Sequence, residues 1–260
     1  MSFISARRLA SLATGSALVA TMAVAAAPGV TFAAGPGPTG FSDRNDGPLT
    51  AYIINPTAPV TGPIDATGYD IAVYFGPGHS GTVTADISGA SHFGVVADGA
   101  KVNVTGSKVH GIGDQPFNST DPMFGMQRGR AISYINGASG TISGNRVFDF
   151  QKSGIEVSGG TLDGGTVRAS TTTSVSVTNN TVTGAGPNAF IAENGIVIRT
   201  GANATVNKNT VSNLYYTPDP TSGAGLFLFD AGRVNVQNNK ITACGTTIDN
   251  SNIAGGHVRA

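Results

Sequence analysis

Short apolar stretches alternate with small polar residues along most of the chain, and one six-residue pattern of this kind recurs. The pattern reads apolar, any, any, Asn or Ser, any, apolar. Its five copies are residues 104–109, 142–147, 177–182, 206–211 and 236–241. Brief alternating stretches bounded by Gly, Asn and Ser are typical of short β-strands joined by tight turns.

A second pattern, a small residue followed by an aliphatic one, precedes each copy. The separations from that aliphatic residue to the last apolar residue of the copy are 14, 15, 27, 15 and 15 residues, and the outlier contains an insertion at 159–173. A weaker copy spans 73–87, and 245–248 resembles the start of a partial one. A fixed period of this kind predicts about six stacked structural repeats, or rungs.

Stacking would bring equivalent apolar residues into columns, because a lone rung cannot bury its own hydrophobic side chains. The three expected columns are Val95, Ile132, Ile155, Ile196 and Leu226; Val104, Ile142, Val177, Val206 and Val236; and Val109, Val147, Val182, Val211 and Ile241. The predicted fold class is therefore all-β, a parallel β-helix (solenoid) of about six rungs.

One polar position is also repeated in every rung, and Asn dominates it. The residues are Ser107, Asn145, Asn180, Asn209 and Asn239. Asn tolerates left-handed backbone, and stacked amide side chains can bond one another. We predict an asparagine ladder here rather than a functional site.

The first 33 residues have the features of a secretory signal peptide: two arginines, an apolar run and small residues before position 34. A membrane anchor fits less well, because the run contains polar residues and ends at Pro28. We therefore expect a secreted protein with a signal peptide at 1–33, a Pro/Gly-rich leader or cap at 34–63, and a β-helix domain at 64–260.

Charge and composition limit the kinds of molecule that the protein is expected to bind. The 15 basic residues include two within the signal peptide, so the expected mature chain carries 13 bases against 15 acids. That balance argues against a nucleic-acid-binding surface, and no later segment predicts a membrane span. Cys244 is the only cysteine, so packing rather than an internal disulfide must stabilise the chain. The sequence identifies no cofactor and no metal site.

The repeats resemble the right-handed parallel β-helix proteins, a pectate-lyase-like superfamily. The similarity lies in the Gly-Ile-x-Val and Val-x-x-Asn-x-Val motifs and spans roughly 64–248. Segments 73–83, 109–118 and 193–198 are similar to uncharacterised secreted bacterial members. The resemblance implies a right-handed solenoid, but many chemistries share that fold.

Three long links, 109–132, 182–196 and 211–226, should leave one corner of the stack side by side. Sites tend to lie on loops raised from a rigid scaffold, so we expect a carbohydrate groove there. The carbohydrate-binding candidates are Tyr215, Tyr216, Asp114, Arg199 and Glu193. The candidates for acid–base and charge-neutralising roles are Glu156, Arg130 and Asp230.

Structural roles compete with these assignments. Glu156 and Arg199 also suit a surface salt bridge, the aspartates suit turn caps, and the aromatic rings suit loop packing. An enzyme would be a polysaccharide lyase, epimerase or glycoside hydrolase, but no catalytic signature of those classes is present. The alternative is a non-catalytic surface or matrix scaffold. Ice binding is disfavoured by one mixed outward column: Ser133, Glu156, Val197 and Phe227.

Overall fold

The computed structural model describes residues 35–36, 49–114, 128–160, 169–249 and 258–259. The expected signal peptide lies outside these residues. The described chain is built of β-strands and one short 3₁₀ turn, Pro220–Ser222. No helix within the described residues is long and apolar enough to cross a membrane.

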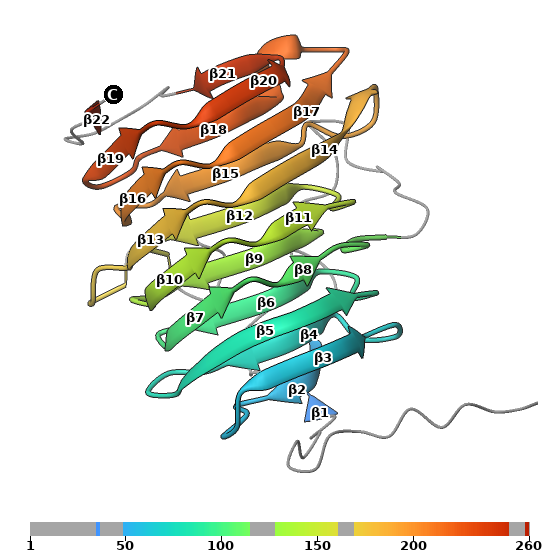
Figure 1. Ribbon diagram of the computed structural model, residues 1–260, viewed down its shortest axis with the longest axis vertical. Coiled ribbons are helices and arrows are strands. Elements are labelled where there is room, and N and C mark those ends of the chain that lie inside the picture. The colour runs from blue at the N-terminus through green and yellow to red at the C-terminus, as the bar shows by residue number, and fades with distance from the viewer. Residues whose placement is uncertain (1–34, 37–48, 115–127, 161–168, 250–257, 260) are drawn as a thin grey trace, which may run out of the picture.

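Strands far apart in the sequence stack side by side along one axis (Figure 1). One sheet has nine strands, and all of its pairings are parallel except that between β1 and β2. In spatial order its strands are β1 (Gly35–Pro36), β2 (Thr50–Ile54), β4 (Ile71–Phe75), β6 (Phe93–Asp98), β9 (Arg130–Ile135), β12 (Ser153–Ser158), β15 (Asn194–Arg199), β18 (Ala224–Phe229) and β21 (Thr246–Asp249).

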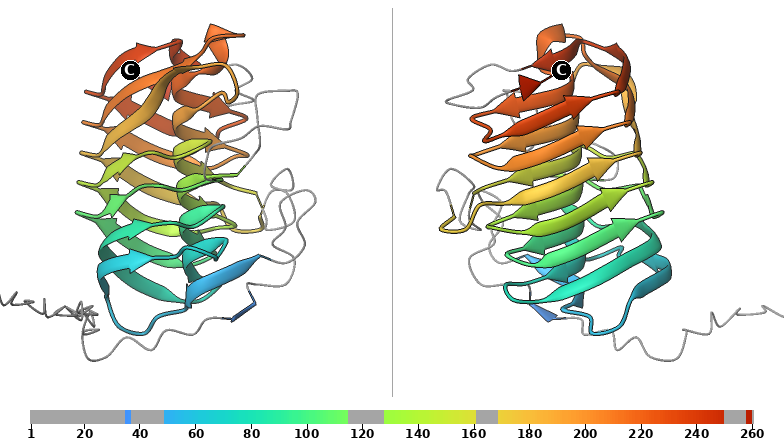
Figure 2. Two further views of the ribbon diagram at one scale, coloured as in Figure 1. Left: turned by 90° about the vertical axis from the view of Figure 1, so that its right-hand side faces the viewer. Right: turned by 60° about the vertical axis from the view of Figure 1, so that its left-hand side comes forward.

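The second sheet has thirteen strands and forms two stacks joined through one long strand, β5 (Ser80–Ser88). Its first stack continues with β7 (Lys101–Thr105), β10 (Ser139–Ser143), β13 (Ser174–Thr178), β16 (Asn203–Asn207), β19 (Val234–Gln237) and β22 (Val258–Arg259). The other stack holds β3 (Val60–Asp65), β8 (Lys108–Val109), β11 (Arg146–Phe148), β14 (Thr181–Asn188), β17 (Thr210–Tyr216) and β20 (Lys240–Cys244). Figure 2 shows that the two sheets form one stack of coils. Buried apolar side chains fill the space between the sheets.

The three predicted columns are confirmed by the strand register. Ile155 pairs with Ile132 on one side and Ile196 on the other, and the other two columns pair in the same way. Residues of all three columns belong to one buried cluster. The stack is longer than the six repeats counted in the sequence. At one end β2 and β3, from the segment expected to be a leader or cap, add a rung, and at the other end β21 extends the stack.

The small residue of the second pattern has a steric cause. In β12, Gly154 and Ile155 both face the interior, and a Cβ on Gly154 would collide with Val182. Gly195 faces Val211 in the same way in the next rung. Two consecutive inward positions therefore interrupt the usual alternation of strand side chains.

The predicted asparagine ladder is present. The Asn145 side chain donates to Asn180 Oδ1 at 2.9 Å and to the Val104 carbonyl at 2.9 Å, and the Asn145 backbone N–H also donates to Asn180 Oδ1. Asn180 and Asn209 repeat this arrangement. At the end of the ladder, the Asn239 side chain donates to the Val206 carbonyl. The sequence suggested that the ladder residues themselves adopt left-handed backbone. Instead, the residue before each of them has positive φ, and this conformation turns the ladder side chain inward.

The expected grouping of long links is confirmed for two of them. β14 and β17 extend beyond their neighbours, and Pro187 and Asn188 pair with Tyr215 and Tyr216. Most of the link 109–132 and of the insertion 159–173 lies outside the described residues.

Candidate functional site

A shallow groove of about 200 Å³ lies on the outer surface of the nine-stranded sheet. It crosses strands β9, β12, β15 and β18, so it runs along the axis of the stack. Its lining residues are Arg130, Lys152, Ser153, Glu156, Asn194, Val197, Arg199, Phe227 and Phe229. We call this surface the groove face. Because the parallel strands fix each outward position, the lining is as rigid as the sheet itself.

At the centre of the groove a buried carboxylate lies between two arginines. Glu156 is 4% exposed. Its Oε2 lies 2.9 Å from Arg130 Nε, and its Oε1 accepts hydrogen bonds from Arg199 Nη2 at 2.8 Å and Nε at 3.0 Å. The predicted contact between Glu156 and Arg199 exists, but its carboxylate is buried and a second arginine joins it, so it is not an isolated surface pair.

The arginines control the charge of Glu156. Burial alone would raise the pKa of this carboxyl, but the charges of Arg130, Arg199 and Lys152 outweigh burial and hold the pKa below its usual range. Glu156 is therefore ionised near neutral pH, and both oxygens are occupied. This arrangement favours holding the arginines in place over donating a proton to a substrate.

The described lining of the groove combines basic side chains with aromatic rings. It contains Arg130, Lys152 and Arg199 as cations and Glu156 as its carboxylate. At the end of the groove on β18, the Phe227 and Phe229 rings lie 5.9 Å apart, and Phe229 is 43% exposed. Cations and exposed rings together can hold an anionic group and the apolar face of a sugar ring.

Five predicted site residues lie outside the groove lining, and three of them are Tyr215, Tyr216 and Asp230. Tyr215 and Tyr216 are carried by the extended end of β17, where Tyr215 is 36% exposed. Asp230 follows β18 in a left-handed turn with φ of 48°. Of the catalytic candidates, the groove thus brings together Glu156 and Arg130 but not Asp230.

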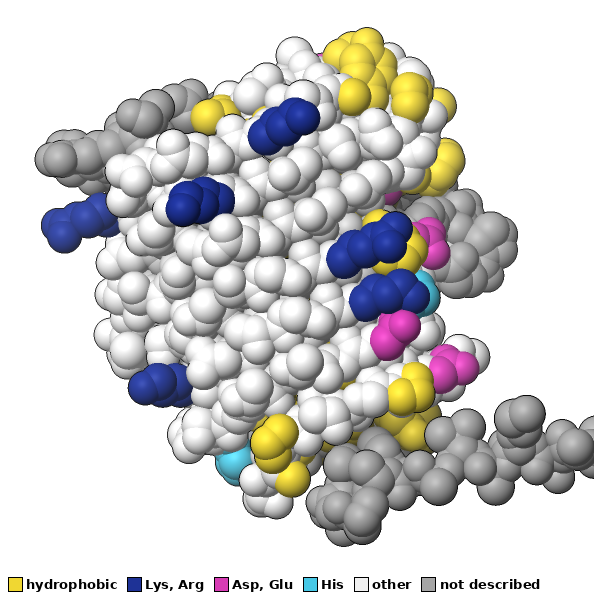
Figure 3. Space-filling model, viewed as in Figure 1, with side chains coloured by type: hydrophobic (Ala, Val, Ile, Leu, Met, Phe, Trp, Pro, Cys, Tyr) yellow, Lys and Arg dark blue, Asp and Glu magenta, His cyan; other side chains and the backbone are white. Residues whose placement is uncertain are grey.

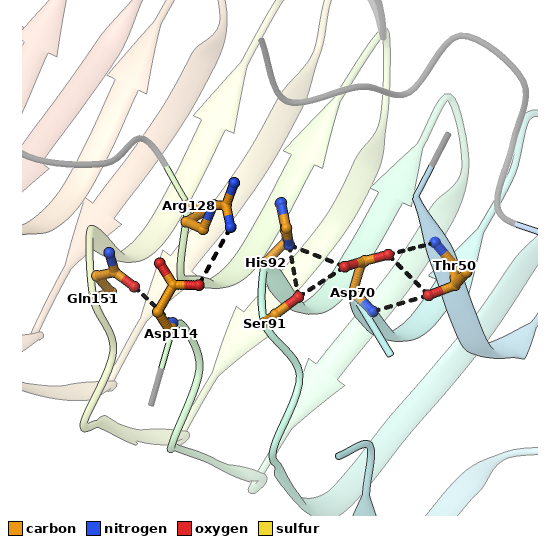
Figure 4. Close-up of polar contacts among 7 residues, drawn as sticks. All are labelled: Thr50, Asp70, Ser91, His92, Asp114, Arg128 and Gln151. Atoms are coloured by element: carbon orange, nitrogen blue, oxygen red, sulfur yellow. Dashed lines mark hydrogen bonds and ion pairs between the residues drawn. The ribbon is translucent and has the colours of Figure 1, made fainter. Parts of the chain in front are cut away.

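Asp114 belongs to a row of polar contacts at the corner before the groove face (Figure 4). Its backbone N–H donates to Gln151 Oε1 at 2.7 Å, and its carboxylate lies 3.3 Å from Arg128 Nη1. The bond to Gln151 joins neighbouring rungs, whereas Arg128 and Asp114 belong to the same link. Asp114 is not among the residues that line the groove.

The same row contains Ser91, His92 and Asp70, the residue types of a nucleophilic triad (Figure 4). Ser91 Oγ lies 2.7 Å from His92 Nδ1, and Asp70 Oδ1 lies 3.3 Å from the same nitrogen. A working triad needs the serine and the carboxylate on opposite ring nitrogens. This cluster therefore joins rungs rather than activating a nucleophile.

Glu193, a predicted binding residue, is buried at 1% exposure next to the groove residue Asn194. Its Oε2 accepts a hydrogen bond from the Ala185 backbone N–H at 2.9 Å, and Oε1 has no partner within the described residues. Burial, reinforced by the charge of Asp149, raises the pKa of Glu193 to about 8. The side chain is thus a protonated acid beneath the corner near neutral pH.

Lys152, Ser153 and Asn194 are groove residues that sequence reasoning missed. Ser153 pairs with both Arg130 and Asn194. Strict alternation counted from Ile155 would place Ser153 inside, but the two consecutive inward residues turn it outward. Aligning all rungs on Arg130 would have found Ser153 and Asn194.

No group of three His, Cys, Asp or Glu side chains that could hold a metal ion occurs in the described part of the chain. The family model described as "Right handed beta helix region" matches residues 65–241. No curated protein matches the chain. No solved structure matches it either.

Proposed function

Because the chain belongs to the right-handed β-helix family, a fold that offers a rigid surface for variable sites, we propose that it is a secreted protein that binds an acidic extracellular polysaccharide in its groove. The carrying observation is a buried carboxylate flanked by two arginines, next to two aromatic rings. Arginine forks suit carboxylates, including those of uronic acids.

Binding is favoured over catalysis by the state of the central carboxylate. A retaining or inverting glycosidase uses two carboxyl groups across the scissile bond, whereas Glu156 is the one carboxylate among the described residues that line the groove. Its low pKa and its two arginine partners leave it poorly suited to proton transfer. The groove holds charge in fixed positions, which is what selective binding of an anionic polymer requires.

The test compares polygalacturonate with its carboxyl-reduced, neutral form by isothermal titration calorimetry. The purified protein should bind the acidic polymer, and raising the salt concentration should weaken binding because partly exposed charges are screened. The same samples followed by ultraviolet absorbance would reveal unsaturated products if the protein were a lyase.

Phe229→Ala should weaken binding about tenfold, since burying the exposed part of the ring against a sugar contributes on the order of 1–2 kcal/mol. Phe190→Ala is the matched control, because Phe190 is similarly exposed at 41% but does not line the groove. If neither polymer binds, the groove proposal is wrong and the rigid-scaffold alternative stands.

A further inference from the structure

A second surface, separate from the groove face, carries a regular grid of short polar side chains. It is the outer side of the first half of β5 and of β7, β10, β13, β16 and β19, and we call it the array face. Its first row is Thr82, Asn103, Thr141, Ser176, Thr205 and Asn235. Its second row is Thr84, Thr105, Ser143, Thr178, Asn207 and Gln237.

Neither row contains a charged residue or an aromatic ring. Lys101 and Arg233 lie in a third outward row at the margin of this face, in line with Asn203 and Ser174. Figure 3 shows the same separation: basic side chains lie around a broad field that is neither charged nor apolar. A polyanion or an apolar partner would find little to bind in that field.

The grid is regular in both directions. Neighbouring strands lie about 4.8 Å apart, and outward residues two positions apart along a strand are separated by about 6.6 Å. The pairings between β7, β10, β13, β16 and β19 run without a register shift, unlike the pairing between β14 and β17. Threonine also has a stiff side chain in β-structure. The face thus presents hydroxyl, amide and methyl groups at a fixed two-dimensional repeat.

The first row leaves its hydrogen-bonding capacity unused by the protein. Thr141, Ser176 and Thr205 have no side-chain hydrogen bond within the described residues, and the same holds for Thr82 and Asn103. In the second row, by contrast, Thr178 donates to Ser143 at 3.1 Å. The unused groups are half-buried or exposed, so they can bond to an ordered layer outside the protein.

We propose that the array face binds ice. Ice is uncharged and periodic, and its surface both donates and accepts hydrogen bonds, at a repeat close to the spacing between rungs. A crystalline neutral polysaccharide is the less suitable occupant, because the rows hold no ring to stack on sugar faces. The mixed column that disfavours ice binding lies on the groove face, where Glu156 and Phe227 interrupt it; the array face has no such interruption.

The experiment measures thermal hysteresis and inhibition of ice recrystallisation by the purified full chain. The protein should shape growing ice crystals and inhibit recrystallisation. Thr205→Lys should reduce both activities at least about tenfold, because a long cation that projects from the first row blocks contact with a flat lattice. Thr210→Lys is the matched control: it is an equally exposed threonine on β17, outside the array face, and should retain both activities.

Thermal unfolding of each variant checks that the fold is intact. Thr205→Val, which keeps the shape and removes the hydroxyl, provides a second test that does not introduce a charge, and it should also lose activity. Absence of ice shaping by the unaltered protein would overturn the proposal. Equal losses of activity in Thr205→Lys and Thr210→Lys would also overturn it. So would a protein that does not affect ice but binds crystalline cellulose, if Thr205→Lys abolishes that binding. None of these outcomes depends on polysaccharide binding by the groove.

Discussion

At the scale of single residues, one repeated position has left-handed backbone: the residue before each member of the asparagine ladder. This position has positive φ throughout, and its occupants are Gly106, Gly144, Asn179, Lys208 and Asn238. Gly and Asn adopt this conformation readily, whereas other side chains pay roughly 1–2 kcal/mol. Lys208, with φ of 57°, is therefore the strained member of the set.

Lys208→Gly should raise the free energy of unfolding by about 0.5 kcal/mol, because relief of the left-handed strain exceeds the added flexibility of the unfolded chain. Urea denaturation measures the change. Lys240→Gly is the control: Lys240 is also exposed but lies in β20 and is not among the residues with positive φ, so glycine should destabilise it. Destabilisation by both variants would contradict this explanation.

Glu193 should make the protein less stable in alkaline solution. Its pKa is about 8 in the folded state and about 4.3 in an unfolded chain. Between these values the folded state binds more protons, so stability should fall as pH rises from about 4.5 to about 8, by an amount on the order of several kcal/mol. Denaturation across this pH range measures the slope.

Glu193→Gln should flatten that slope and be more stable than the unaltered protein at pH above about 8. Asp219→Asn supplies the comparison, because Asp219 is a half-buried cap residue whose pKa is lowered by hydrogen bonds from Thr221 and Ser222. Asp219→Asn should leave the fall in stability between about pH 4.5 and about pH 8 unchanged. Parallel pH profiles for the unaltered protein and Glu193→Gln would refute the role of this carboxyl.

At the level of elements, the ladder joins consecutive turns through buried bonds. Asn180→Ala should cost about 3 kcal/mol, because the Asn145 backbone N–H, one Asn145 side-chain N–H and the Ile142 carbonyl lose their Asn180 partner inside the stack. Asn239→Ala, at the half-buried end of the ladder, should cost about 1 kcal/mol, because water can reach the vacated groups. Equal losses in urea denaturation would show that burial does not set the cost.

The strands and their register could be predicted because apolar spacing and turn residues act locally and repeat. The groove could be predicted only in part. Arg130, Glu156 and Arg199 come together because they hold outward positions on neighbouring rungs. Tyr215 and Glu193 lie in corner segments, whose path depends on tertiary packing and not on a period. Even a regular repeat therefore leaves its corners unspecified.

At the scale of the whole molecule, the stack is a sum of similar turns, each packed on its neighbours. Removing residues 194–223 deletes one turn of 30 residues, since Leu226 occupies the position of Ile196 in the next rung. The shortened chain should still fold, with a lower unfolding temperature, because every column stays in register. Removing only 194–208 should prevent folding. Circular dichroism distinguishes these outcomes, and loss of structure in both would argue against independent turns.

The long strand β5 has a mechanical consequence. It bonds to β7 with its first half and to β8 with its second, so one continuous segment anchors two stacks. A tensile load applied at the C-terminus would peel off coils one by one, each yielding at a short strand. β7 and β8 would already be released when the load reaches β5, which is then held by six continuous residue pairs with β3. Release of β5 should therefore need more force than release of β8, which pairs with β5 at two positions.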